Sequence, residues 1–454
     1  MLKVLLIRPR PHNETIGLQH VMICEPLELE YLVSNVPEEI KNQVHIKIYD
    51  LIVEKQGYKD ILLENKPDFV LFTGYITHVG IVKEMSRTAK EMLPGICTGV
   101  GGVHAEVVPD DFNSEYIDFI YSKNGIDGFN TTLSMLLNGN NAIQINKEIN
   151  QAAKNSSFNY RHPDRSAVSK YRRHYYYMFH SPCALIKTSF GCPYNCSFCF
   201  CKEITDGKYF SRDMEDVLDE LQTIEEEEIY IVDDDFLFNT KKLREFIDGI
   251  QSRNIKKKFL VYGRADFIVE NKGLISELKH IGLQAVIVGI ESVRSKDLQA
   301  YNKKTTKDIN EGCIKVLRAL DIELYATLII PLDFTVADFN ELTAWIKSLN
   351  VRFVNLQPLT PLPGTDIFDS YTSDLLVKRE DYEVWDMAHV VLKPEFMSIR
   401  KFYAQLLKAY YKVIMRPKHM VFLIRKYGFK SNLKMLAGSS LVSMQYMKKI
   451  VRGR

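Results

Sequence analysis

The sequence predicts an α/β protein with two successive parallel-sheet domains followed by a helical C-terminal region. Strand-like apolar runs alternate with helical stretches in two separate series, and the alternation ends near residue 375. Strands that are separated by helices form βαβ units and therefore parallel sheets. At 454 residues the chain is long enough for two or three domains.

The first series predicts a doubly wound, flavodoxin-like (Rossmann-like) domain over residues 1–138. Its strand-like runs are 3–8, 44–49, 68–74, 96–102 and 117–122. Ligands of such sheets bind beyond the carboxyl ends of the strands. The candidate ligand-binding loops are therefore 8–17, 74–80, 101–106 and 122–127.

Residues 139–180 break the rhythm and are predicted to be a linker. The stretch from 138 to 157 is polar, whereas "YRRHYYYMFH" (171–180) is basic and aromatic. Such a segment could bind nucleic acid through stacking and charge. Packing between two domains is the favoured interpretation.

The second series predicts a parallel barrel over residues 181–375, a partial (β/α)6 form of the TIM type. Its strand-like runs are 184–189, 229–233, 258–263, 284–289, 324–330 and 352–357. The catalytic end of such a barrel is formed by the carboxyl ends of its strands. Residues 376–454 are predicted to form helices.

Composition excludes several classes of protein. Hydrophobic residues make up 46% and charged residues 26%, as in ordinary folded proteins. The apolar run before Arg8 is too short for a signal-peptide core, and no stretch approaches the roughly 18 apolar residues of a membrane span. We therefore expect a cytoplasmic protein whose thiols are reduced.

Charge is distributed unevenly along the chain. Residues 396–454 contain 14 Lys and Arg and no Asp or Glu. A basic segment of this kind favours an anionic partner such as lipid headgroups, a phosphorylated substrate or nucleic acid. The alternative is a solvated helical surface.

Four of the eight cysteines lie within ten positions, in "SFGCPYNCSFCFCK" (189–202). Cys192, Cys196 and Cys199 form C-x3-C-x2-C directly after the first barrel strand. Three close thiolates could hold three irons of a 4Fe–4S cluster and leave the fourth iron open. Zinc is the alternative, although no second Cys pair follows. Cys201 is too close to Cys199 to be a comfortable fourth ligand.

The motif "GCPYNCSFC" resembles the signature of the radical S-adenosylmethionine (radical SAM) superfamily, C-x3-C-x-aromatic-C. The resemblance implies that the open iron binds the amino and carboxylate groups of SAM. An electron, from a donor such as flavodoxin or ferredoxin, then cleaves SAM to methionine and a 5′-deoxyadenosyl radical. Phe198 occupies the aromatic position, which lies near the adenine in that superfamily.

The same resemblance implies further SAM contacts at the barrel strand ends. The implied residues, in chain order, are Asp234, Phe236, Asn239, Arg264, Glu291, Ser292 and Pro331. Arg264 could pair with the SAM carboxylate. The alternative for the Asp and Glu residues is a structural role as helix caps or at strand ends.

A doubly wound domain before such a barrel resembles the cobalamin-binding subfamily of these enzymes. "KPDFVLFTG" (66–74) and "GVGGVHAEVVPDDF" (99–112) are similar to its third and fourth strand–loop turns. The implied cobalamin-binding residues are Gly74, His78, Gly101, Gly102 and His104. The chain has no D-x-H-x-x-G motif, and "SKNGIDGF" (122–129) lacks the glutamates usual in the fifth turn. A domain that has lost cobalamin therefore remains an alternative.

The expected function is that of a radical SAM enzyme which, with cobalamin, methylates an unactivated carbon of a small-molecule or lipid substrate. The first alternative is a cyclase or oxidoreductase of the same architecture that transfers no methyl group. The second is a non-catalytic corrinoid- or RNA-binding module with a structural metal. Nucleic acid is not the expected partner, and the basic C-terminal region predicts peripheral membrane contact.

Overall fold

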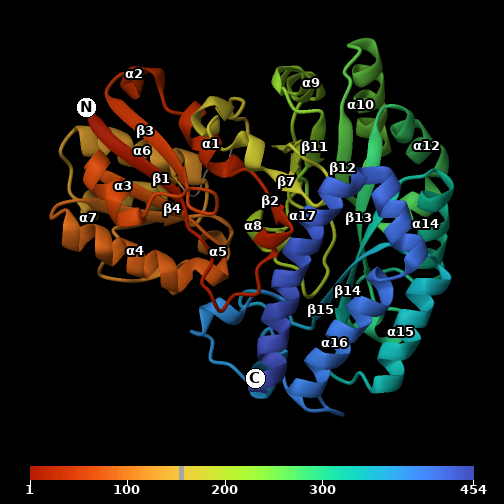
Figure 1. Ribbon diagram of the computed structural model, residues 1–454. Helices are drawn as coiled ribbons and strands as arrows, with labels where there is room; N and C mark the ends of the chain where they lie inside the picture. Colours follow the sequence, from red (N-terminus) through yellow and green to blue (C-terminus); the bar gives the residue numbers. More distant parts are fainter. Residues whose placement is uncertain (153–157, 454) are drawn as a thin grey trace. The chain divides into compact units, whose positions relative to one another are not determined.

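The computed structural model describes residues 1–152 and 158–453, which form two compact units (Figure 1). Unit 1 comprises Met1–Thr15, Glu25–His174 and Arg379–Asp386. Unit 2 comprises Ile16–Cys24, Tyr175–Lys378 and Met387–Arg454. Each unit is thus assembled from three stretches of the chain.

Unit 1 is built on a five-stranded parallel sheet, which confirms the predicted doubly wound domain. The strands are β1 (Leu2–Arg8), β3 (Val44–Asp50), β4 (Phe69–Thr73), β5 (Cys97–Gly101) and β6 (Phe119–Ile120), in the order β3-β1-β4-β5-β6. All five residues of the central strand β4 are buried, as expected for a parallel sheet covered on both faces.

The helices of unit 1 are α1 (Leu27–Ser34), α2 (Glu38–Lys41), α3 (Tyr58–Asn65), α4 (Val79–Met92), α5 (Val103–Val107), α6 (Gly125–Leu137) and α7 (Ala142–Ala152). Its one-turn 3-10 helices are η2 (Ile76–His78), η3 (Pro109–Phe112), η4 (Arg165–Val168), η5 (Arg172–His174) and η7 (Tyr382–Val384). Helix α7 lies in the stretch predicted to be a polar linker. Ile145 and Ile149 are buried on one face of this helix, because residues four positions apart share a face.

Unit 2 is built on a six-stranded parallel sheet. Its strands are β8 (Cys183–Ile186), β11 (Glu228–Ile231), β12 (Lys258–Gly263), β13 (Leu283–Glu291), β14 (Glu323–Ile330) and β15 (Phe353–Pro358). They follow one another around the sheet in chain order, and β8 and β15 are its two ends. The sheet is therefore the open, partial barrel that the second series predicts.

Helices cover this sheet and enclose one continuous apolar core. They are α8 (Cys201–Ile204), α9 (Met214–Thr223), α10 (Thr240–Ser252), α11 (Ala265–Glu270), α12 (Lys272–His280), α13 (Ser295–Ala300), α14 (Lys307–Ala319) and α15 (Val336–Ser348). Shorter elements of unit 2 are η1 (Leu18–His20), η6 (Asp369–Asp374) and the antiparallel pairs β2 (Met22–Ile23) with β7 (Tyr176–Tyr177) and β9 (Ser189–Phe190) with β10 (Phe210–Ser211).

The C-terminal region is helical, as predicted. Helices α16 (Ile399–Ile414) and α17 (Pro417–Arg452) pack side by side (Figure 1). Phe402 and Leu406 of α16 belong to the core of unit 2. Helix α17 is interrupted at Gly428, whose φ is +76°. Over the part of the chain that the structure describes, no helix combines the length and apolarity needed to cross a membrane.

Candidate functional site

The cysteine loop follows β8 at the carboxyl edge of the sheet in unit 2. It runs from β9 to α8 and contains Cys192, Cys196 and Cys199. Its first turn requires glycine, because Gly191 has a φ of +81° and a Cβ there would lie 2.1 Å from the carbonyl oxygen of Lys208. The fold therefore places all three cysteines where a barrel enzyme carries out its chemistry.

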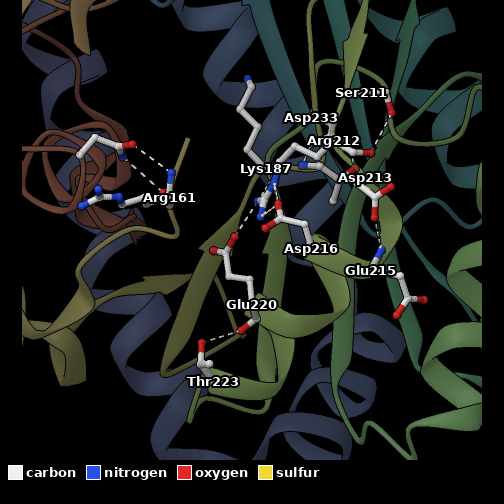
Figure 2. Close-up of polar contacts among 12 residues, drawn as sticks. Arg161, Lys187, Ser211, Arg212, Asp213, Glu215, Asp216, Glu220, Thr223 and Asp233 are labelled. Carbon is white, nitrogen blue, oxygen red and sulfur yellow. Dashed lines mark hydrogen bonds and ion pairs between the residues drawn. The ribbon is translucent and has the colours of Figure 1, made fainter. Parts of the chain in front are cut away.

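Two buried polar clusters hold the base of this loop, and Figure 2 shows the one around Arg212. Asp233 accepts hydrogen bonds from the backbone N–H groups of Thr188 (2.7 Å) and Ser189 (3.1 Å), and from both of their hydroxyls. Arg212 donates to the carbonyl oxygen of Lys187 at 2.8 Å and to Glu220 at 2.6 Å. These bonds fix the chain immediately before the first cysteine.

The three cysteines are free thiols in a partly buried setting. Burial raises the pKa of Cys192 to about 12, and burial also raises the pKa of Cys196. Among the described residues, no group of three His, Cys, Asp or Glu side chains is arranged to hold a metal ion. The loop carries thiol groups, which are suitable ligands for iron. Binding a cluster would require a change of loop conformation that brings the three sulfur atoms together.

Cys201, which the spacing suggested as a bystander, lies against Cys199. A hydrogen bond between the two thiols lowers the pKa of Cys199 and raises that of Cys201. Asp234, a predicted SAM contact, is also hydrogen-bonded with Cys201. The structure therefore brings Asp234 to the thiol pair.

A buried ion pair lies next to the cysteine loop. Lys303 donates from Nζ to Oε1 of Glu291 at 2.9 Å, and both side chains are buried. Burial opposes the charge of Lys303, but the ion pair with Glu291 acts in the opposite direction, and the pKa of the lysine is raised. Gly289 leaves room for the pair, since a Cβ there would lie 2.1 Å from the Glu291 carboxylate.

Arg264, predicted from sequence to contact SAM, joins this group. Its guanidinium bonds to Asp266 at 2.8 Å and to the carbonyl oxygen of Lys303 at 2.9 Å. It also stacks on the ring of Tyr194, 3.8 Å from the ring centroid. Arg264 and Lys303 thus place two buried cations beside the cysteine loop.

Asp235 is the most unusual acid of this region. Its side chain is buried, and neither carboxylate oxygen has a hydrogen-bond partner among the described residues. Burial raises its pKa to about 8, although Arg264 and Lys303 act in the opposite direction. An unpaired buried carboxyl is costly, so it is a candidate for binding a cationic group of a ligand.

Other predicted SAM contacts have structural partners. Asn239 caps α10 and accepts from the backbone N–H of Lys241 at 3.1 Å. Ser292 donates to Asp297 at 2.7 Å. Asn239 therefore starts α10 as its N-cap, and Ser292 bonds within the loop that leads into α13.

The remaining predicted contacts are apolar. Phe198 lies edge-on to Tyr301, with ring centroids 5.7 Å apart. Phe236 is buried against Phe246 in the core of unit 2. Pro331 is buried directly after β14. Of these, Phe198 lies on the cysteine loop itself.

The carboxyl edge of the sheet in unit 1 brings together the loops after β1, β4 and β5. Gly102 follows β5 with φ +98° and ψ 177°, and a Cβ there would lie 2.8 Å from the hydroxyl of Thr73 and 3.0 Å from the backbone nitrogen of Gly74. This backbone conformation is open essentially to glycine alone. At Gly101 a Cβ would lie 3.6 Å from Tyr121, an ordinary contact.

His78 lies at this edge with one nitrogen unsatisfied. Its Nδ1 accepts from the backbone N–H of Tyr75 at 3.2 Å, whereas its buried Nε2 has no partner among the described residues. Burial lowers its pKa to about 4, with a further contribution from Arg8. Because Nδ1 accepts, the proton of the neutral ring is on Nε2, and that nitrogen presents a donor and not a lone pair.

His104 is held differently. Its Nε2 is 2.8 Å from Oδ2 of Asp111, and both side chains are buried. The other oxygen of Asp111 pairs with Arg379 at 3.1 Å. His104 is therefore one end of a fixed polar chain with Asp111 at its centre, and its Nε2 is already bonded.

Residues 379–386 reach this edge from the far end of the sequence. The carbonyl oxygen of Glu383 accepts from the hydroxyl of Thr15 at 2.9 Å, and Tyr382 packs against the core of unit 1. Trp385 is buried and donates to the carbonyl oxygen of Arg379 at 3.1 Å. Sequence reasoning missed this segment, since no local pattern indicates which domain it joins.

Comparison with known proteins identifies both parts of the chain. Residues 186–346 match the radical SAM superfamily, and residues 21–129 match the B12 binding domain. The first match contains the three motif cysteines, and the second contains the loops after β4 and β5.

Relatives with both parts span most of the chain. It is 28% identical to the hopanoid C-3 methylase of Methylococcus capsulatus, over 97% of this chain and 84% of that protein. It is 24% identical to the anaerobic magnesium-protoporphyrin IX monomethyl ester cyclase of Cereibacter sphaeroides, over 87% of this chain and 68% of that protein. The cobalamin-dependent S-adenosylmethionine radical enzyme OxsB, with aqua-cobalamin and S-adenosylmethionine bound, has the same fold: the TM-score is 0.65 at 16% identity, over 97% of this chain and 72% of that one.

Proposed function

We propose that this chain, which combines a radical SAM domain with a B12-binding domain, methylates an unactivated carbon of a small-molecule substrate. The observation that carries the proposal is the presence of both domains in one chain, the first with its cysteine motif at a strand end. The match to the superfamily and the 28% identity to a methylase identify an enzyme, so a non-catalytic binding module no longer applies.

The cysteine loop is the proposed cluster site. A bound 4Fe–4S cluster supplies the electron that cleaves SAM to methionine and a 5′-deoxyadenosyl radical. We assign its protein ligands to Cys192, Cys196 and Cys199, whose side chains are free thiols on one loop. The bonds of Asp233 and Arg212 hold the loop base while the cysteines converge.

The buried charges beside the loop suit the amino-acid part of SAM, which carries one ammonium and one carboxylate. Asp235 offers an unpaired carboxyl for the ammonium, and Lys303 offers a cation for the carboxylate. Arg264 supports Lys303 through the backbone carbonyl. This assignment moves the ammonium contact from Asp234 to Asp235.

The carboxyl edge of unit 1 is the proposed cobalamin site, and bound cobalamin supplies the methyl group. Gly102 fits this role because its lack of a Cβ lets the loop after β5 approach the loop after β4 closely. The donor at Nε2 of His78 suits a hydrogen bond to the ligand, and Nε2 of His104 is engaged by Asp111. We therefore propose that neither histidine binds cobalt.

The reaction also needs a reductant and a substrate. A one-electron donor such as flavodoxin or ferredoxin would supply two electrons per turnover, one to cleave SAM and one to balance the transfer of the methyl group of the second SAM to a substrate radical. Reduced thiols on the cysteine loop suit the reducing cytoplasm. Each turnover would consume one SAM for the radical and a second for the methyl group. The products would be methionine with 5′-deoxyadenosine, and S-adenosylhomocysteine.

Product analysis tests this function. Anaerobically reconstituted enzyme, supplied with cobalamin, a reductant and SAM deuterated in its methyl group, should form 5′-deoxyadenosine and S-adenosylhomocysteine. A host-cell extract should then yield a product that carries the deuterated methyl. Formation of 5′-deoxyadenosine without S-adenosylhomocysteine or labelled product would contradict methyl transfer.

That last result would instead favour a second candidate, a radical SAM cyclase without methyl transfer. The 24% identity to a magnesium-protoporphyrin ester cyclase is the observation behind it. The absence of D-x-H-x-x-G from the sequence is compatible with either function. Both candidates require the same cluster and SAM site, so only the fate of the methyl group separates them.

A further inference from the structure

The second half of α17, residues 429–452, has apolar side chains on two opposite faces. One face packs into unit 2: Met435 and Tyr446 are buried, and a Cβ at Gly438 would lie 1.9 Å from the carbonyl oxygen of His20. A helix on the surface of a domain needs one apolar face to join the core. The second face is therefore not explained by the fold of unit 2.

This second face, the outer stripe, consists of large exposed side chains. Their exposed fractions range from 51% to 74%, for Phe429, Leu433, Leu436, Met444, Met447 and Val451. They recur every three or four residues, with Ser440 in the single gap. At 100° per residue they fall within a band about 80° wide, centred opposite the buried face. An apolar row of this kind marks an interaction surface.

Basic residues follow one side of the outer stripe. Lys430, Lys434, Lys448 and Arg452 are exposed and lie about 80–120° from the centre of the stripe on the helical wheel. No acidic residue occurs anywhere from 396 to 454. This half of α17 therefore offers apolar contact and positive charge together, with no acidic side chain of its own.

We propose that the outer stripe docks on the surface of a lipid bilayer that contains anionic lipids. An amphipathic helix with a basic flank lies in the plane of the interface, where its apolar row enters the acyl boundary and its cations reach the headgroups. The stripe extends over about 33 Å at 1.5 Å per residue, so it would anchor unit 2 along a line.

A second copy of the chain fits this surface less well. Pairing two stripes would bring the basic flanks of both copies together with no acidic residue of either helix to compensate. Like charges that meet at an interface oppose association. A bilayer with negative headgroups supplies the missing charge.

Vesicle flotation tests the proposal on the full-length holoprotein. The protein should float with vesicles of equimolar phosphatidylcholine and phosphatidylglycerol, and high salt should weaken this binding. The double variant Leu433→Gln, Met447→Gln should lose at least tenfold in partitioning. The double variant Lys430→Gln, Lys448→Gln should lose about 25-fold on the anionic vesicles, from about fivefold per charge.

The matched control is Leu63→Gln. Leu63 is 55% exposed on α3 of unit 1, and Leu433 is 56% exposed on α17. The control should float like the unchanged protein. Intact protein that floats with neither neutral nor anionic vesicles would overturn the proposal, as would binding that survives in the Leu433→Gln, Met447→Gln variant. A dimer that dissociates in this variant, without vesicle binding, would assign the stripe to a second copy.

Discussion

The carboxyl edges of the two parallel sheets differ in how their buried polar side chains are paired. At the edge in unit 2, buried ionisable groups lie close together, and one of them, the carboxyl of Asp235, has no hydrogen-bond partner among the described residues. At the edge in unit 1, buried side chains are already paired in the chain from His104 through Asp111 to Arg379, and His78 is left with one unsatisfied nitrogen. On the proposed function, a charged ligand would complete the first edge, whereas the ion pair of Asp111 with Arg379 is present at the second edge without a ligand.

This difference explains why one edge has a recognisable sequence motif and the other does not. An iron cluster and a zwitterion would demand particular side chains at particular positions, and the C-x3-C-x2-C spacing in unit 2 supplies three thiols on one loop. A large ligand that is held mainly by shape and by backbone groups demands space, which glycine provides at Gly102. Substitutions should therefore act through ligand chemistry in unit 2 and through backbone geometry in unit 1.

The largest expected effect is that of Cys196→Ala. Loss of one of three thiolates should abolish cluster assembly, so iron content and 5′-deoxyadenosine formation should fall to background. Corrinoid binding by the same variant should persist, because unit 1 is unchanged. Cys201→Ala is the control and should retain iron and SAM cleavage. SAM cleavage that survives in Cys196→Ala would refute the cluster assignment.

Lys303→Gln should weaken SAM binding about 10- to 100-fold, the loss expected for one charge-assisted hydrogen bond. Equilibrium binding of SAM to the reconstituted enzyme measures this. Lys296→Gln removes an exposed lysine whose side chain is 65% accessible, and it should leave SAM affinity unchanged. Because Glu291 loses its partner in Lys303→Gln, unfolding must be measured alongside. Equal SAM affinity in both variants would remove Lys303 from the site.

Gly102→Ala should destabilise unit 1 by about 4 kcal/mol, through a backbone conformation closed to alanine and contacts that are too short. Gly139→Ala is the matched control: its φ is +73°, but a Cβ there meets nothing within 4 Å. It should cost only about 1 kcal/mol. Denaturant unfolding compares the two, and equal losses would show that the approach of Gly102 to the loop after β4 has no role.

The smallest expected effect is a pH dependence at His78. The unfolded chain binds a proton there below the ordinary pKa of 6.5, whereas the folded chain does so only below about 4. Stability should therefore fall as the pH drops from 6.5 to about 4, by at most about 3 kcal/mol. His78→Leu should flatten this decline, and substitution of the exposed His45 with Gln should not. An unchanged slope in His78→Leu would place the titration elsewhere.

Sequence reasoning succeeded where the signal is local. The strand runs gave both sheets, and the cysteine spacing gave the position of the candidate cluster. It failed where a residue acquires its role from distant partners. No local pattern distinguishes Lys303 from the other lysines, and only the fold brings it to Glu291.

Two further features could not be predicted from the local sequence pattern. Asp234 and Asp235 are adjacent, and only the direction of the chain after β11 decides which of them is left unpaired. In the stretch predicted to be a linker, Ile145 and Ile149 form the buried face of α7, but the polar composition around them led to the linker prediction.

The return of residues 379–386 to unit 1 has a consequence for biosynthesis. The ribosome synthesises the chain from its N-terminus. Residues 379–386 of unit 1 are therefore made only after all six strands of the sheet in unit 2. Until then Asp111 lacks Arg379, and Thr15 lacks the carbonyl of Glu383. A nascent chain halted before residue 379 would hold an unfinished first unit, and a fragment cut at residue 174 would never complete it.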